Sequence, residues 1–460
     1  MTNRHTIGKA RIELQLPDTA QADVSTVREW CVSVLLEDLD GVLSTICGPN
    51  EVMQLVRLSL VLTLPAWEGE RSTAIREALQ RQIREQVEQQ AGQSFTHKVT
   101  LAEHRANTLL HYLQHGTLPT LLTEAGWSEW REGVQQQALA DPWFQQRLAA
   151  VLTSEVTFRR WWQFTGEEFQ YQLLDQWVPI TGLPWALFTE QLAAVQRLSF
   201  TNTVELLQSV FLVLHHNWVV RHDSAQFLAQ WFNRVPFAVF RPQSVELLIG
   251  TLPNPLRQQV LSLFDQLSEE RLLSPEDQPT GTLRSKARAT ELDTHLAEGI
   301  TVANAGLVLL ANFLPTFLER LNEVSDNQLR HPGRMPMLLH YLATGETEAP
   351  EWQLLFPKLL CGLLPADTCD HRIKVTQEVA QEVQNLLHSV IEHWGRLRNT
   401  SPAGLREAFL QRTGQLTVED TVYRLTIKEE TLDVLLQFVP WSFRYVRLPW
   451  MPKLLATEWA

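Results

Sequence analysis

Few side chains in this sequence have the types and spacing that metal or acid–base chemistry requires. Cys361, Cys369 and His371 are the one group of soft metal ligands. The two cysteines do not have the C-x2–4-C spacing of a zinc site, and a fourth ligand is missing. Cys361 lies in the apolar run LLCGLL, which is typical of a buried thiol. We therefore expect these residues to hold no metal.

Acidic and histidine side chains give two weaker candidates. Glu37, Asp38 and Asp40 lie together, but no glycine-turned loop of oxygen ligands surrounds them, so we expect a solvated acidic edge. His215 and His216 lie in the apolar run SVFLVLHHNWVV, where a hydrogen-bonded core histidine is the usual finding. The sequence also lacks the GxxxxGK, GxSxG and HExxH motifs, and it has no GxGxxG after a strand. We predict that the protein is not an enzyme and binds no cofactor.

Composition and charge limit the partners. The chain of 460 residues carries a net charge of −13, which argues against nucleic acid, because phosphate binding needs clustered cations. Its four cysteines are too few and too scattered for a secreted disulfide framework. The first residues, MTNRHTIGKARIELQL, lack the pattern of a signal peptide, so we expect synthesis in the cytoplasm.

One stretch without charges, residues 299–318, is long enough to span a bilayer. However, Asn304 and Asn312 lie inside it, and Pro315 would interrupt a helix there. No basic flank marks a cytoplasmic end. We therefore interpret the stretch as a buried helix of a globular domain and expect no membrane partner.

The hydrophobic pattern predicts an α+β protein that is predominantly α-helical. Alternating apolar residues predict strands at 11–17 and 56–65, with a helix at 24–43 between them, which gives an N-terminal β-α-β. From about residue 101 to 270 the apolar residues follow the helical period, and prolines or glycines break the pattern regularly. This region is expected to form a central all-α helical array.

The C-terminal module is predicted to be helical to about Gln411 and to end in a small β-α-β unit. Short strands are expected at 415–420 and 421–427, followed by a helix at 430–440 and a strand at 442–450. The domain boundaries that follow are an N-terminal α/β module at 1–95, a Trp-rich all-α region at 96–268, a polar linker with proline and glycine at 269–290, and the C-terminal module at 291–460.

The pattern LLHYLxxG occurs twice, at residues 109–116 and 338–345. We interpret the two copies as related helical units, in which Gly116 and Gly345 are the C-cap residues that permit a left-handed turn. A solenoid would need more repeats than two.

The remaining candidates are side chains that could contact a partner. The chain has 16 tryptophans, and this residue fills cores as well as protein interfaces. Adjacent Trp161 and Trp162 cannot both face the core on one side of a helix, so at least one is expected to face a partner or a second layer. Trp441 and Trp450 each follow a proline and could either dock a partner or pack in the core. Arg406 is a candidate interface charge, with a solvated helix face as the alternative.

Four blocks of the sequence resemble one known family. They are GITVANAGLVLLANFLPTFLERL at 299–321, LLHYLATGETEAPEWQLLFPKLLCGL at 338–363, VIEHWGRLRNTSPAGLREAFLQRTGQL at 390–416, and the Trp- and Pro-rich run at 423–459, which contains ETLDVLLQFVPW and SFRYVRLPW. In order and spacing these blocks are similar to the contractile injection system tape measure family, proteins of phage-tail-like secretion particles. The N-terminus matches that family more loosely, through His5, RIELQLP at 11–17 and VRLSLVLTLP at 56–65, and the middle of the chain, roughly residues 100–290, shows little resemblance of its own.

The resemblance implies a non-enzymatic assembly component of a bacterial contractile particle, which governs the length of its tube and sheath. An alternative is an assembly chaperone, cap or cargo adaptor that binds tail subunits through the Trp-rich region. Expected partners are inner tube, baseplate or cap subunits, in the cytoplasm during assembly or within the released particle. One continuous helix of this length would span roughly 690 Å. The 23 prolines and 16 tryptophans instead predict a set of compact modules.

Overall fold

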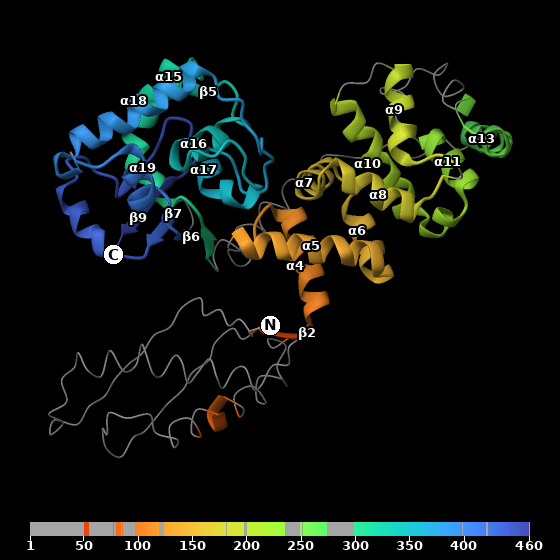
Figure 1. Ribbon diagram of the computed structural model, residues 1–460, viewed down its shortest axis with the longest axis horizontal. Helices are drawn as coiled ribbons and strands as arrows, with labels where there is room; N and C mark the ends of the chain where they lie inside the picture. Colours follow the sequence, from red (N-terminus) through yellow and green to blue (C-terminus); the bar gives the residue numbers. More distant parts are fainter. Residues whose placement is uncertain are drawn as a thin grey trace. The chain divides into compact units, whose positions relative to one another are not determined.

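The computed structural model describes residues 50–54, 77, 80–83, 85, 97–118, 124–180, 182–196, 200–234, 249–250, 252–273, 299–397, 399–419 and 422–459 (Figure 1). The chain divides into two compact units, Met1–Asn107 and Thr108–Ala460. In the first unit, β1 (Glu51–Gln54) pairs antiparallel with β2 (His97–Thr100). The β-α-β predicted at 11–17, 24–43 and 56–65 lies outside the described residues.

The first part of the second unit is the helical array that the sequence predicts. After α4 (Leu101–His115), which begins in the first unit, the described helices are α5 (Glu124–Ala140), α6 (Pro142–Val151), α7 (Glu155–Thr165), α8 (Glu167–Trp177), α9 (Trp185–Gln196), α10 (Phe200–His216), the 3-10 helix η2 (Trp218–His222), α11 (Ser224–Arg234) and α13 (Asn254–Leu273). Residues 269–273 of the predicted linker are therefore helical, and the rest of that linker lies outside the described residues.

Local sequence explains where the helices of the array begin. At the start of α6, the carboxylate of Asp141 accepts hydrogen bonds from the main-chain N–H groups of Trp143 and Phe144, at 3.0 and 3.3 Å. Pro142 takes the first helical position, where its missing N–H costs nothing. The hydroxyl of Ser154 caps α7 in the same way. These caps turn the chain sharply and let short helices pack on one another.

The C-terminal part of the unit combines short helices with a five-stranded sheet. Its elements in chain order are β3 (Ile300–Val302), η3 (Ala305–Phe313), α15 (Leu314–Arg320), β4 (Val324–Ser325), β5 (Gln328–Leu329), α16 (Met335–Thr344), η4 (Glu351–Leu354), α17 (Leu355–Leu360), α18 (Gln377–His393), η5 (Gly395–Leu397), α19 (Pro402–Leu405), η6 (Arg406–Leu410), β6 (Gly414–Glu419), β7 (Val422–Ile427), η7 (Thr431–Phe438), β8 (Tyr445–Val446) and β9 (Leu454–Trp459). The helices α15 and α18 pack side by side (Figure 1).

The sheet has the order β3-β6-β7-β9-β8. The pair β7–β9 is parallel, and the other neighbours are antiparallel. One face is apolar and buried, with side chains such as Leu416, Leu425 and Leu455 in a core shared with the helices. The alternation of buried and exposed residues along β6 and β7 is the pattern of a sheet covered on one side.

Three predictions for this part need correction. Residues 299–318 are largely buried, as expected, but they form the strand β3, the 3-10 helix η3 and the start of α15 rather than one helix. Pro315 lies in the first turn of α15, directly after η3 ends at Phe313, so the interruption of one continuous helix that the sequence predicts at Pro315 is confirmed. The helix expected at 430–440 is the 3-10 helix η7.

The strand expected at 442–450 is confined to the two residues of β8, and the longer strand β9 follows it. The terminal unit is therefore β-β-3₁₀-β-β rather than β-α-β. The overall class, predominantly α with a small amount of β, is confirmed. Among the described residues, no helix combines the length and apolar character that crossing a membrane would require.

Candidate functional site

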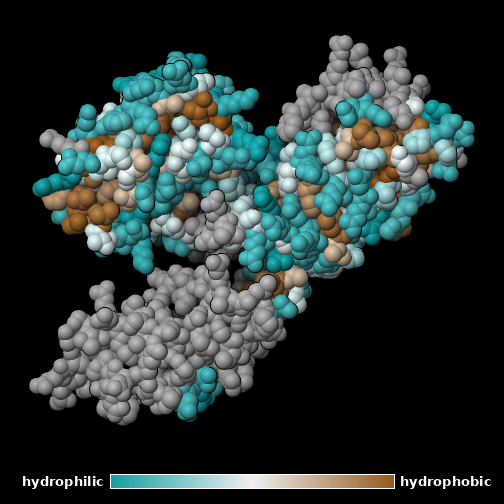
Figure 2. All heavy atoms as spheres, in the orientation of Figure 1, coloured by the Kyte–Doolittle hydropathy of each residue, from teal (hydrophilic) through white to brown (hydrophobic). Residues whose placement is uncertain are grey.

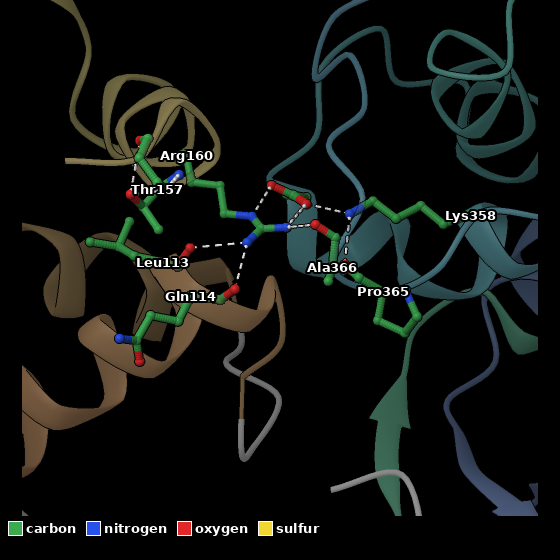
Figure 3. Close-up of polar contacts among 9 residues, drawn as sticks. Leu113, Gln114, Thr157, Arg160, Lys358, Pro365 and Ala366 are labelled. Atoms are coloured by element: carbon green, nitrogen blue, oxygen red, sulfur yellow. Dashed lines mark hydrogen bonds and ion pairs between the residues drawn. The ribbon is translucent and has the colours of Figure 1, made fainter. Parts of the chain in front are cut away.

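Three charged side chains that are far apart in the sequence meet in the interior of the second unit (Figure 3). Arg160 of α7 donates two hydrogen bonds to the carboxylate of Glu351 in η4, from Nε at 3.0 Å and from Nη2 at 3.1 Å. Lys358 of α17 also donates to this carboxylate, and to the carbonyl of Pro365 at 3.3 Å. The side chains of both cations are 0% exposed, and that of Glu351 is 1% exposed. We call Arg160, Glu351 and Lys358 the buried charge cluster.

Main-chain carbonyls compensate the second positive charge of the cluster. Arg160 Nη1 donates to the carbonyls of Leu113 and Gln114, at 2.9 and 3.1 Å, and Nη2 donates to the carbonyl of Ala366 at 2.7 Å. Leu113 and Gln114 belong to the last turn of α4, where the carbonyls have no helical partner and the helix dipole is negative. One guanidinium therefore joins α4, α7 and the C-terminal part of the unit (Figure 3).

The absence of a side chain at Gly116 permits this close approach. Gly116 has φ +74, the left-handed conformation that the sequence predicts for it. A Cβ atom at this position would lie 2.8 Å from Arg160 Nη2 and 2.8 Å from the carbonyl oxygen of Pro365. The first copy of LLHYLxxG thus ends in a glycine for two reasons, its backbone conformation and the space that the arginine needs.

The pKa shifts in and beside the cluster indicate a structural role rather than proton transfer. Burial by itself raises the pKa of Glu351, but the charges of Lys358 and Arg160 outweigh burial, so the pKa is lowered. Burial raises the pKa of neighbouring Tyr112 well above its ordinary value. A carboxylate that two cations hold ionised is a weak base, and a phenol with a raised pKa is a weak acid. These groups therefore connect two parts of the fold.

The cysteine and histidine group lies beside this cluster. Cys361 and Cys369 are free and buried, so the prediction of a buried Cys361 thiol is confirmed. Burial raises the pKa of the Cys361 thiol well above its ordinary value and that of Cys369 to about 12, which leaves neither as a thiolate near neutral pH. In the part of the chain that the structure describes, no three His, Cys, Asp or Glu side chains gather as metal ligands would.

The predicted pair of adjacent tryptophans is buried on two sides of α7. Trp161 is 0% exposed, donates to Gln170 at 3.0 Å and packs against Phe169 of α8. Trp162 is 8% exposed and packs against Phe158, which contacts Phe211 of α10. The helix α7 thus lies between two layers, one of the two alternatives for this pair. A contact of these residues with a partner stays a prediction.

The other three predicted residues lie in the C-terminal part and are half-buried. Trp441 donates to the carbonyl of Leu309 at 2.9 Å, and Trp450 donates to that of Leu360 at 2.8 Å, so both indoles fasten a terminal loop to the core. The structure does not bring these tryptophans together with Trp161 and Trp162. Arg406 is the first residue of η6 and donates to the carbonyl of Leu342 in the last turn of α16, at 3.0 Å; its role as an interface charge also stays a prediction.

Some apolar side chains of the C-terminal part remain on the surface. Leu432, Val434 and Phe438 of η7 are 52, 57 and 43% exposed, and Tyr445 of β8 is 69% exposed. Figure 2 shows apolar atoms in separate patches on a largely hydrophilic surface. The segment ETLDVLLQFVPW thus contributes exposed apolar side chains as well as the buried Asp433, which Arg412 binds at 2.8 and 2.9 Å.

Sequence reasoning missed the buried charge cluster. One signal could have pointed to it, because Lys358 lies inside the apolar run LLFPKLLCGLL, where a lysine is buried only with a partner. Arg160 gave no such signal. In the sequence it looks like its neighbour Arg159, which forms an ordinary exposed ion pair with Glu155 on the same helix.

Comparison with models of protein families identifies the family of this chain. A family model described as contractile injection system tape measure protein matches residues 4–459, which is nearly the whole chain. No curated protein and no solved structure matches the chain. The matched range includes all four blocks of the predicted resemblance and also the helical array that holds Arg160. The chain therefore belongs to the contractile injection system tape measure protein family and has a structural role in the assembly of such particles.

Proposed function

We propose that this protein governs the length of the tube and sheath in the folded, compact state that its second unit adopts. The observation that supports this is the buried charge cluster, which ties the helical array to the C-terminal part. A stretched chain would have to give up this cluster and the apolar cores on either side of it. The protein would therefore act at one end of the growing tube, as a cap or nucleus made with other particle subunits.

The lengths of the helices support the same conclusion. Among the described residues the longest helix is α13, with 20 residues, which spans about 30 Å. A linear ruler needs a length proportional to the number of residues, whereas a compact cap sets length through the timing of its binding and release. The two mechanisms differ in how tube length responds to a longer chain.

Tube length after an insertion distinguishes them. About 40 helix-forming residues are inserted in the segment 274–289, and tubes from particles assembled with this variant are measured by electron microscopy. A stretched ruler would lengthen the tube by roughly 60 Å. Our proposal expects unchanged length at normal yield, together with tubes of irregular length or no tubes when the chain is deleted. A proportional increase in length would contradict it.

A compact fold also suits the second candidate, an assembly chaperone that leaves the particle. Quantitative mass spectrometry of purified particles distinguishes the two. A cap remains at a few copies per particle, whereas a chaperone is found with free subunits and is absent from finished particles. A cargo adaptor would appear in proportion to cargo, and its amount would not affect tube length.

A further inference from the structure

The two LLHYLxxG helices end in the same arrangement. In α4 the pattern ends at Gly116, with φ +74, and in α16 it ends at Gly345, with φ +87. A guanidinium from a distant segment covers the last carbonyls of each helix, Arg160 in the first case and Arg406 in the second. The sequence repeat therefore extends to a structural feature, an arginine at the C-terminal end of the helix, that the sequence itself did not reveal.

The two arginines bind one equivalent carbonyl of the pattern, Arg160 through Nη1 and Arg406 through Nε. Arg160 donates to the carbonyl of Leu113 at 2.9 Å, and Arg406 donates to that of Leu342, the equivalent residue of the pattern, at 3.0 Å. Arg406 also donates to the carbonyl of Tyr341 at 3.3 Å. A Cβ atom on Gly345 would lie 3.2 Å from Arg406 Nη1, so this glycine also leaves room for a guanidinium.

The two sites differ in what covers them. The segment Pro350–Glu351–Trp352 covers the first site, where Glu351 binds Arg160 and Tyr112 is only 1% exposed. At the second site Tyr341 and Arg406 are both partly exposed. Among the described residues no carboxylate pairs with Arg406, and its Nη1 group has no acceptor at hydrogen-bond distance.

The lowered pKa of Arg406 agrees with a site that contains no counterion for its guanidinium. Burial lowers the pKa of Arg406, and the only charge effect that opposes burial comes from Tyr341. A cation that has lost part of its water and has no counterion gains free energy when a carboxylate binds. The partly exposed ring of Tyr341, 6.0 Å from the guanidinium, supplies an apolar surface next to that charge.

We infer that Arg406, Tyr341 and Gly345 form a docking site for a glutamate at the start of a helix in a partner protein. The bound segment has the chemistry of Pro350–Glu351–Trp352, a carboxylate followed by an aromatic residue. A second copy of this chain cannot supply its own segment, because Glu351 is already buried against Arg160 and Lys358. The occupant is therefore another protein of the particle. This docking site does not depend on the mechanism by which the chain sets tube length.

A peptide of known sequence tests this site. The probe is fluorescently labelled ETEAPEWQLL, which has the sequence of residues 346–355, and its binding to the full chain is followed by fluorescence anisotropy. We expect saturable binding, and about tenfold weaker binding when the peptide carries glutamine in place of its Pro-Glu-Trp glutamate, because a hydrogen bond to a charged group is lost. Arg406→Gln should weaken binding by a similar factor.

A double-mutant cycle protects the test against indirect effects. The glutamine peptide should bind Arg406→Gln no more weakly than the glutamate peptide does, because the shared contact is already absent. Arg447→Gln, which removes an exposed arginine of the same module, is the matched control and should leave binding unchanged. Melting curves confirm that each variant is folded. The proposal would be overturned if the glutamate peptide bound wild type and Arg406→Gln equally well, or if Arg447→Gln weakened binding as much as Arg406→Gln does. An absence of binding at several millimolar peptide would also overturn it.

In particles, Arg406→Gln should lower the fraction of tube ends that carry the chain, and with it the yield of finished particles. Finished particles that do contain the chain should have tubes of normal length, which separates this result from a failure of the proposed length function. Normal yield and normal incorporation of a folded Arg406→Gln chain would also overturn the docking site.

Discussion

Replacement of Glu351 by glutamine should destabilise the second unit strongly. The substitution leaves Arg160 and Lys358, both fully buried, without an anion. Removal of one partner of a buried ion pair costs about 3–5 kcal/mol, because the remaining charge stays out of water. With an unfolding entropy of about 2.1 cal/mol/K per residue, a unit of roughly 350 residues should melt about 4–7 °C lower.

Differential scanning calorimetry of the full chain measures this change, with Glu419→Gln as the matched control. Glu419 pairs with Arg424 at 2.6 Å, but the side chains are 61 and 45% exposed, so water screens the pair and the control should melt close to wild type. Equal melting temperatures for Glu351→Gln and Glu419→Gln would refute the reasoning.

The same variant gives a pH test with a definite sign. Because the pKa of Glu351 is lowered in the folded protein from its ordinary 4.5, its carboxylate stabilises the fold above that pH. This stabilisation is lost as the pH falls below 4.5 and through the folded pKa. The difference between wild type and Glu351→Gln should therefore be full at neutral pH and shrink in acid, and a constant difference would show that the charge is not its cause.

Three further predictions concern single residues. Lys358→Met should lower the free energy of unfolding clearly less than Glu351→Gln does, because the remaining pair of Arg160 and Glu351 has no net charge. A larger loss of stability by calorimetry would contradict our account of the cluster's charge. Gly116→Ala should lose about 1–3 kcal/mol more stability than Gly182→Ala, because both glycines have positive φ but the atom nearest to a Cβ at Gly182 is 3.8 Å away. Equal stabilities of the two variants would contradict the close contact. Burial lowers the pKa of His340 to about 4, so stability should fall by about 3 kcal/mol as the pH drops from 6.5 to 4, and His340→Gln should remove this slope in urea unfolding at several pH values.

The sequence was sufficient to predict those features of the fold that depend on local pattern. The helical array, its break at Pro142, the left-handed glycines of the two LLHYLxxG helices and the burial of Cys361 all follow from neighbours in the chain. The strand β9 was missed because LLATEW has no clear alternation, and its pairing with β7 and β8 supplies what its own residues do not.

The candidate sites depended on contacts that local pattern does not contain. Arg160 and Glu351 are 191 residues apart, and neither differs in its immediate sequence from a surface residue. Arg406 was identified as a candidate from its position on a helix, but its relation to α16 became visible only in the fold. The repeat of LLHYLxxG was readable, whereas the arginine that accompanies each copy comes from a different segment.

The position of β9 affects how this protein is made. It is the last of the five strands in the chain but lies between β7 and β8, so the sheet cannot close while its residues are still inside the ribosome. A chain that terminates early would carry an unpaired β7 edge, which invites pairing with other chains or degradation. The C-terminal sheet therefore closes only after the segment that contains β9 has been synthesised, which makes the pairing of β9 with β7 and β8 a late step in folding.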